Sequence, residues 1–104
     1  MKYVLAFFLT CTAVLFACKK EDNFVPVCDG SAPTYDADIS AIITQNCVGC
    51  HSSYASYSGL SSDLSNGNFE REVLNEQTMP QGGSLSNAQL NQIKCWAENG
   101  FPEN

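Results

Sequence analysis

The sequence is poor in basic residues, in histidine and in methionine. Five lysine and arginine residues stand against eleven acidic ones, and the formal net charge at pH 7 is −6. This acidity argues against nucleic acid as a partner and favours a protein with a basic docking patch, although acidity that serves only solubility explains it equally well. The chain has one histidine, His51, and two methionines, Met1 and Met79. A site that needs two histidines is therefore excluded.

Long apolar runs are also scarce. Residues 3–17 are almost wholly apolar, but they are fewer than the ~20 residues that a membrane-spanning helix needs. Because Lys2 precedes this run, the sequence predicts a secretion signal. No run of alternating apolar and polar residues indicates a β-sheet, and no internal repeat is present. A chain of 104 residues has room for a single domain at most.

The end of the apolar run, Leu15-Phe16-Ala17-Cys18, resembles the lipobox of bacterial lipoproteins. This resemblance implies that residues 1–17 are a signal peptide and that lipidated Cys18 anchors the exported protein to a membrane. The residue after the cysteine is Lys19 rather than an aspartate, which resembles lipoproteins sorted to an outer membrane. Such a protein would face the periplasm or the cell surface. Residues 18–35 are charged and then irregular, which predicts a tether. Ordinary cleavage that leaves a free Cys18 is the alternative.

Helical periodicity begins after the tether. Asp36 or Asp38 can cap a first helix, because apolar residues follow at intervals of three and four, namely Ile39, Ile42, Ile43 and Cys47. A second, shorter helix is predicted over residues 69–76. Between residues 51 and 68 the chain is rich in serine and glycine, which predicts a loop.

The last helix has the clearest start. Ser86 is a predicted N-cap, Gln89 completes a capping box, and Leu85 can pack on Leu90. Gly100 follows the helix and favours its termination after the preceding residue. Three helices without a sheet predict an all-α fold.

The pentapeptide Cys47-Val48-Gly49-Cys50-His51 indicates the chemistry. Two thiols three positions apart can form thioethers with the vinyl groups of one haem, while the adjacent imidazole binds the iron. A redox dithiol would be expected beside a strand, and no strand is predicted. Adjacent Cys50 and His51 can hardly both bind one tetrahedral zinc ion. The motif therefore predicts covalently attached haem c.

The second axial ligand can be sought by elimination. Met79 is the only methionine after the signal, and Pro80 favours an extended backbone from which the thioether can project. A His/Met pair would raise the reduction potential relative to two imidazoles. A lysine ligand, an open position, or a Met79 that only packs in an apolar loop are the alternatives.

The order of these features along the chain resembles a small class I cytochrome c, close to the single-haem domains of bacterial lipoproteins. The features are the first helix, the Cys47–His51 motif, Met79-Pro80 and the helix ending Trp96-Ala97-Glu98-Asn99-Gly100. The resemblance covers about residues 36–102, within a domain spanning 36–104. It implies that the first and last helices cross near Trp96 and that three leucines pack on the haem: Leu60, Leu64 and Leu74. A short middle section and the absence of an obvious basic partner for the propionates depart from the pattern. Tyr54 or Tyr57 could hydrogen-bond the propionates, or either could be a surface aromatic.

Two cysteines remain once Cys11 leaves with the signal and the lipid and haem sites are assigned. In an oxidising compartment, Cys28 and Cys95 suggest a disulfide. It would close a loop of about 67 residues, worth about 4 kcal/mol in the chain-entropy description. The class I arrangement would bring the two segments together.

The leading functional hypothesis is a membrane-anchored carrier of single electrons between redox partner proteins. With both axial positions occupied, the iron has no place for a substrate, and no second ionisable cluster suggests an enzyme. One alternative is a haem-based ligand binder or sensor in which Met79 is absent from the iron or easily displaced. Another is an electron-transfer subunit of a larger redox complex.

Overall fold

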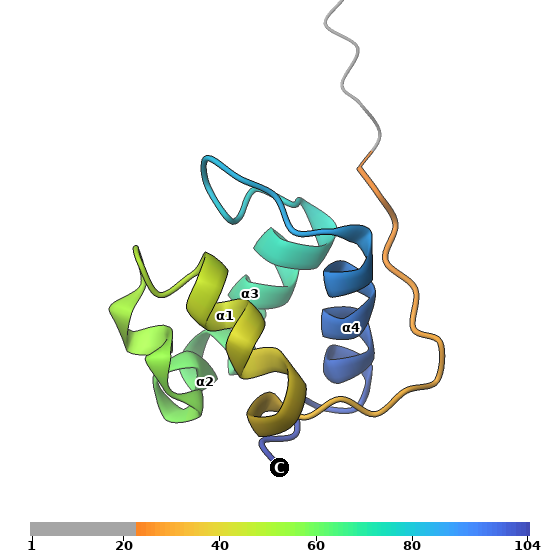
Figure 1. Ribbon diagram of the computed structural model, residues 1–104, viewed down its shortest axis with the longest axis horizontal. Helices are drawn as coiled ribbons and strands as arrows, with labels where there is room; N and C mark the ends of the chain where they lie inside the picture. The colour runs from red at the N-terminus through yellow and green to blue at the C-terminus, as the bar shows by residue number, and fades with distance from the viewer. Residues whose placement is uncertain (1–22) are drawn as a thin grey trace, which may run out of the picture.

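The computed structural model describes residues 23–104, so the predicted signal peptide and Cys18 lie outside the described residues. Within residues 23–104 the fold is all-α and contains no strand (Figure 1). Its elements are η1 (Tyr35–Ile39), α1 (Ser40–Asn46), η2 (Ser52–Ala55), α2 (Tyr57–Ser65), α3 (Asn68–Glu70), η3 (Arg71–Asn75) and α4 (Asn87–Glu98). In this part of the chain no helix is both long and apolar enough to cross a membrane.

The first predicted helix is formed by η1 and α1 together. It begins earlier than expected, because its N-cap is Thr34 rather than Asp36 or Asp38. The Thr34 hydroxyl accepts a hydrogen bond from the backbone of Ala37, and the Asp38 carboxylate accepts one from the backbone of Thr34. These two bonds satisfy amide groups that the first turn of a helix leaves without partners. The apolar face is as predicted, since it buries Ile39, Ile42 and Ile43.

The predicted loop between residues 51 and 68 is wrong, because this stretch contains η2 and the nine-residue helix α2. Ser56 caps α2 by accepting a hydrogen bond from the backbone of Gly59, at 3.1 Å. Leu60 and Leu64 lie one turn apart and are both buried. Serine and glycine are weak helix formers, so the burial of this apolar pair, rather than local propensity, accounts for the helix.

The last helix, α4, confirms the predicted start. Ser86 and Gln89 form the capping box, with each side chain bonded to the other's backbone amide. Trp96 of α4 is fully buried, and its indole nitrogen donates to the carbonyl of Pro102 at 2.9 Å. The helix packs against η1 and η3, and the rings of Trp96 and Tyr35 lie 6.2 Å apart. The first and last helical segments therefore meet near Trp96. The second predicted helix is also present, as α3 and η3.

An extended segment precedes the helices and runs along α4 (Figure 1). We call residues 23–28 the N-terminal strap. Phe24 of the strap packs on the core, and Cys28 is joined to Cys95 of α4 by a disulfide. Sequence composition predicted a tether over residues 18–35, but the described part of that stretch lies on the domain. The disulfide and the Phe24 contact account for this difference.

Candidate functional site

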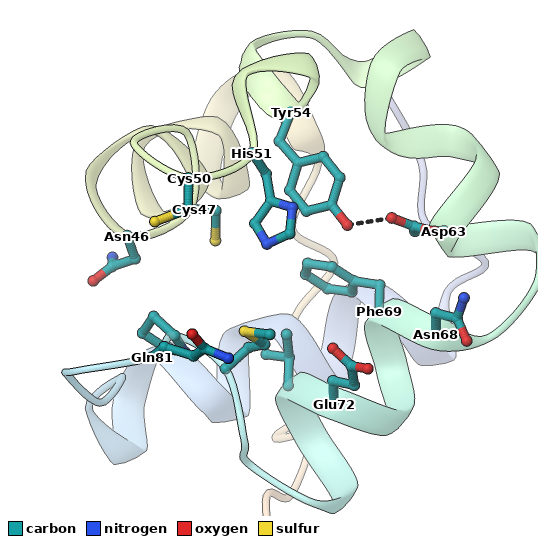
Figure 2. A pocket seen from close by; sticks show the side chains of 13 residues that line it. Asn46, Cys47, Cys50, His51, Tyr54, Asp63, Asn68, Phe69, Glu72 and Gln81 are labelled. Atoms are coloured by element: carbon teal, nitrogen blue, oxygen red, sulfur yellow. Dashed lines mark hydrogen bonds between the residues drawn. The ribbon is translucent and has the colours of Figure 1, made fainter.

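A cavity of about 440 Å³ opens beside the end of α1 (Figure 2). Its size lies in the range of about 300–1,000 Å³ that is usual for ligand sites. It brings the Cys47–His51 motif together with Met79, which comes from the loop between η3 and α4. The full lining is Asn46, Cys47, Cys50, His51, Tyr54, Asp63, Asn68, Phe69, Glu72, Val73, Met79, Pro80 and Gln81.

The two cysteines of the motif lie where α1 ends. A tight turn forms there, because the backbone amides of Cys50 and His51 both donate to the carbonyl of Cys47, at 3.2 and 2.8 Å. Neither thiol takes part in a disulfide. Cys47 is half-buried, and burial raises the pKa of its thiol, whereas Cys50 is exposed. Both side chains lie beside the cavity and are free for covalent attachment (Figure 2).

The His51 imidazole stacks on the ring of Tyr54, with centroids 4.7 Å apart and planes inclined by 14°. The Tyr54 hydroxyl in turn donates a short hydrogen bond to Asp63 of α2 (Figure 2). Burial, followed by this bond, raises the pKa of Tyr54, and the same bond lowers the pKa of Asp63. Tyr54 is thus fixed between α2 and the imidazole, and it limits the positions that His51 can adopt.

The predicted role of the tyrosines toward propionates meets an obstacle in the structure. A phenol has one proton to donate. Tyr54 donates it to Asp63, and Tyr57 donates to the carbonyl of Phe101 at 2.7 Å. Either tyrosine would have to give up its present hydrogen-bond acceptor before it could donate to a haem propionate.

The wall opposite His51 and Tyr54 includes Glu72 and Gln81 (Figure 2). The carbonyl of Glu72 accepts hydrogen bonds from the backbone amides of Thr78 and Met79, at 2.9 and 3.3 Å. These bonds hold the start of the loop against η3, and the Met79 side chain lines the cavity. The structure therefore brings the two predicted axial ligands to one cavity from distant parts of the sequence.

The apolar lining differs from the leucines implied by the resemblance. Leu60, Leu64 and Leu74 lie in the hydrophobic core and do not line the cavity. Phe69 and Val73 line it instead. Residues four apart lie on one face of a helix, whereas the next residue is rotated by about 100°. Val73 therefore shares a side of the helical turn with Phe69, and both belong to the core as well as to the cavity wall, whereas Leu74 belongs to the core alone.

Two carboxylates in the lining, Asp63 and Glu72, were not predicted as site residues. Asp63 receives the Tyr54 hydroxyl, and Glu72 lies 3.4 Å from the guanidinium of Arg71, in an exposed ion pair. Arg71 offsets part of the charge of Glu72, whereas the neutral phenol of Tyr54 stabilises the Asp63 carboxylate without offsetting its charge. No sequence pattern pointed to them, because a lone acidic residue on a helix is most often a solvated one.

The donor set of the cavity fits a haem c. Two free thiols can form thioethers, an imidazole and a thioether can bind iron from two sides, and Phe69, Val73 and Pro80 supply apolar contact to a macrocycle. No protein-family model, curated protein or solved structure matches the chain. What the cavity binds must therefore be inferred from its own residues.

Proposed function

We propose that the protein is a class I c-type cytochrome that binds one haem c in this cavity and carries single electrons between partner proteins. The observation that supports the proposal is the meeting of the CxxCH motif and Met79 in one cavity of suitable size. The all-helical fold, with its first and last segments in contact, is compatible with it. When bound, the haem would supply a one-electron Fe(III)/Fe(II) couple.

The residues of the chain have distinct parts in this proposal. Cys47 and Cys50 would hold the group covalently, and His51 and Met79 would be the ligands of its iron. Tyr54 orients the imidazole through the stacking contact. With both axial positions filled, no position is open for a substrate, so electron transfer without a substrate reaction is the expected function.

The charge of the described residues favours a basic partner. Their two basic side chains are Arg71 and Lys94, and both lie near carboxylates of neighbouring helical turns. Most of the acidic groups have no such compensation, so a partner with a basic patch would be attracted electrostatically.

We further propose that lipidated Cys18 keeps the carrier at a bacterial membrane. Cys18→Ala should move the protein from the membrane fraction to the soluble fraction.

An optical spectrum of protein matured in a haem-attaching bacterial host tests the ligand set. A low-spin spectrum with the weak far-red band of thioether ligation is expected. Met79→Ala should abolish that band and give a ferrous form that takes up carbon monoxide readily, because it opens one axial position. A high-spin parent that already takes up carbon monoxide would favour the ligand binder, and an unchanged Met79→Ala spectrum would show that another group is the ligand.

Haem attachment can be tested separately with matched cysteine pairs. The Cys47→Ser/Cys50→Ser variant should lose all colour that resists acid–organic extraction. Cys28→Ser/Cys95→Ser removes the same number of sulfur atoms but lies in the disulfide rather than at the cavity. It should keep the colour. Extraction of the haem from the parent would contradict covalent attachment.

A further inference from the structure

The loop that carries Met79 begins at Gln77, which directly follows Glu76, the C-cap of η3. Gln77 has a left-handed backbone, with φ at 51°. The side-chain amide nitrogen of Gln77 donates to the carbonyl of Leu74 at 3.2 Å and to the carbonyl of Phe24 in the N-terminal strap. One side chain thus connects the end of η3, the start of the Met79 loop and the strap.

Three further contacts fasten the strap to the domain. Asn23 donates from its side chain to the carbonyl of Glu76 at 2.8 Å, directly beside the Gln77 contact. The backbone amide of Val27 donates to the Asn91 side chain of α4 at 2.9 Å. The disulfide of Cys28 then fixes the far end covalently. The strap therefore bridges the end of η3 and α4.

Beyond Pro80 the loop has little support of its own. Residues 81–84 are exposed, and Gly82 and Gly83 lie among them. Gln81 and Gly82 form a turn of their own, and no hydrogen bond joins these four residues to another element of the described chain. The loop is therefore held mainly at its start, by the Glu72 carbonyl and by Gln77 with the strap.

We propose that Gln77 and the N-terminal strap are a positioning device that keeps the Met79 loop closed over the cavity, and so determines how firmly Met79 is retained on the iron. This inference rests on the proposed function. A loop that moves away carries the thioether with it, whereas a loop that is held in place keeps the thioether beside its position on the iron. An external ligand binds only the molecules in which Met79 is displaced, so its apparent affinity reports the population of the open loop.

Imidazole titration of the ferric holoprotein measures that population. Gln77→Glu keeps the size of the side chain but replaces its amide donor with a carboxylate that repels two carbonyls. Loss of two neutral hydrogen bonds should lower the apparent Kd for imidazole about tenfold. Cys28→Ser/Cys95→Ser frees the far end of the strap and should shift the Kd in the same direction.

Two controls separate positioning from general effects. Gln45→Glu makes the same charge change on the exposed side of α1, where the Gln45 side chain makes no hydrogen bond within the described residues, and it should leave the Kd unchanged. Tyr57→Phe removes the hydrogen bond to Phe101, away from the strap. It should lower the thermal midpoint and leave the imidazole Kd at the parent value.

The outcomes distinguish the two proposals. A parent without the far-red band would overturn the His/Met assignment and this inference with it. A parent with the band and a Gln77→Glu variant of unchanged Kd would overturn the positioning role alone, as would an equal shift in Tyr57→Phe. If Gln77→Glu does not accumulate, Gln77→Asn decides in its place, because asparagine tolerates the left-handed backbone but is one methylene too short to reach the strap.

Discussion

Replacement of Gly59 by alanine should destabilise the protein, although alanine is the better helix former. Gly59 lies in the first turn of α2, directly beneath η2. A Cβ atom at this position would lie 1.8 Å from the carbonyl oxygen of Ser53 and 2.8 Å from its carbonyl carbon. These are backbone atoms, so no side-chain rotation can relieve the overlap. One of the two elements has to shift.

The sign of the effect depends on which of two terms is larger. Alanine in place of glycine gains about 1 kcal/mol of helix propensity. Overpacking costs about 1–3 kcal/mol, and a contact with fixed backbone belongs at the upper end of that range. The expected net loss is about 2 kcal/mol, which corresponds to a fall of about 10 °C in Tm for a domain of this size. Since η2 carries Tyr54, the shift should also disturb the stacking on His51.

Denaturant unfolding of the holoprotein, followed by far-UV circular dichroism, measures this loss. Gly83→Ala is the matched control, because nothing lies within 4 Å of its added Cβ and its backbone is not left-handed. It should be neutral or stabilise by about 0.4–1 kcal/mol through the unfolded state. A Gly59→Ala protein as stable as the parent would refute the close approach of α2 to η2.

Three further predictions concern other parts of the fold. Cys28→Ser/Cys95→Ser opens a loop of 67 residues and should lower the free energy of unfolding by about 4 kcal/mol, measured by urea titration. Ser86→Ala removes the N-cap of α4 and should cost about 1 kcal/mol in the same titration, and no loss would show that the capping box contributes nothing. The hydrogen bond from Tyr54 lowers the pKa of folded Asp63, so the stabilisation by its carboxylate is present above the ordinary value of about 4 and is lost as the pH falls through the folded pKa. Asp63→Asn should therefore be less stable than the parent at pH 7 and equal to it at low pH, and a constant difference would contradict the linkage.

The helices that could be predicted from sequence are those whose signals are local. The capping box of α4 and the isoleucine spacing of α1 depend on residues within a few positions of one another, and both were confirmed. The cap of the first helix was missed because Thr34 and Asp38 form it together. In the sequence, Asp36 and Asp38 are equally acceptable as N-caps and as acidic residues of a first turn, so the pattern alone does not place the start of the helix.

Features that depend on tertiary contact were not predictable in the same way. The helix α2 contains five serines and glycines among nine residues, and only its contact with the core selects a helix over a loop. The strap has the composition of a linker, and although its disulfide was predicted from the two remaining cysteines and is present, the contact of Phe24 with the core was not predicted. In both cases the deciding partner lies far away in the sequence.

In the candidate site, too, some residues could be predicted from local sequence and others could not. The spacing of Cys47, Cys50 and His51 indicated its chemistry, and elimination indicated Met79. Which apolar residues line the cavity was not accessible, because that depends on how the helical turn of η3 is rotated. A pattern of apolar residues four apart identifies a face of a helix, but it does not say whether the face meets the core or a cavity. The helix predicted over residues 69–76 contained Phe69 and Val73, but the sequence assigned neither residue a role.

The two walls of the cavity differ in how firmly they are held. On the His51 side, the motif follows directly from α1, Tyr54 of η2 stacks on the imidazole, and Asp63 of α2 holds Tyr54. On the Met79 side, the loop depends on backbone bonds to Glu72 and on the Gln77 contact with the strap. A change of affinity for external ligands should therefore arise from the Met79 wall. If the protein binds haem as proposed, an electron carrier and a ligand binder built on this fold would differ in the stability of a few hydrogen bonds there, while the proposed covalent attachment and His51 ligand would be the same.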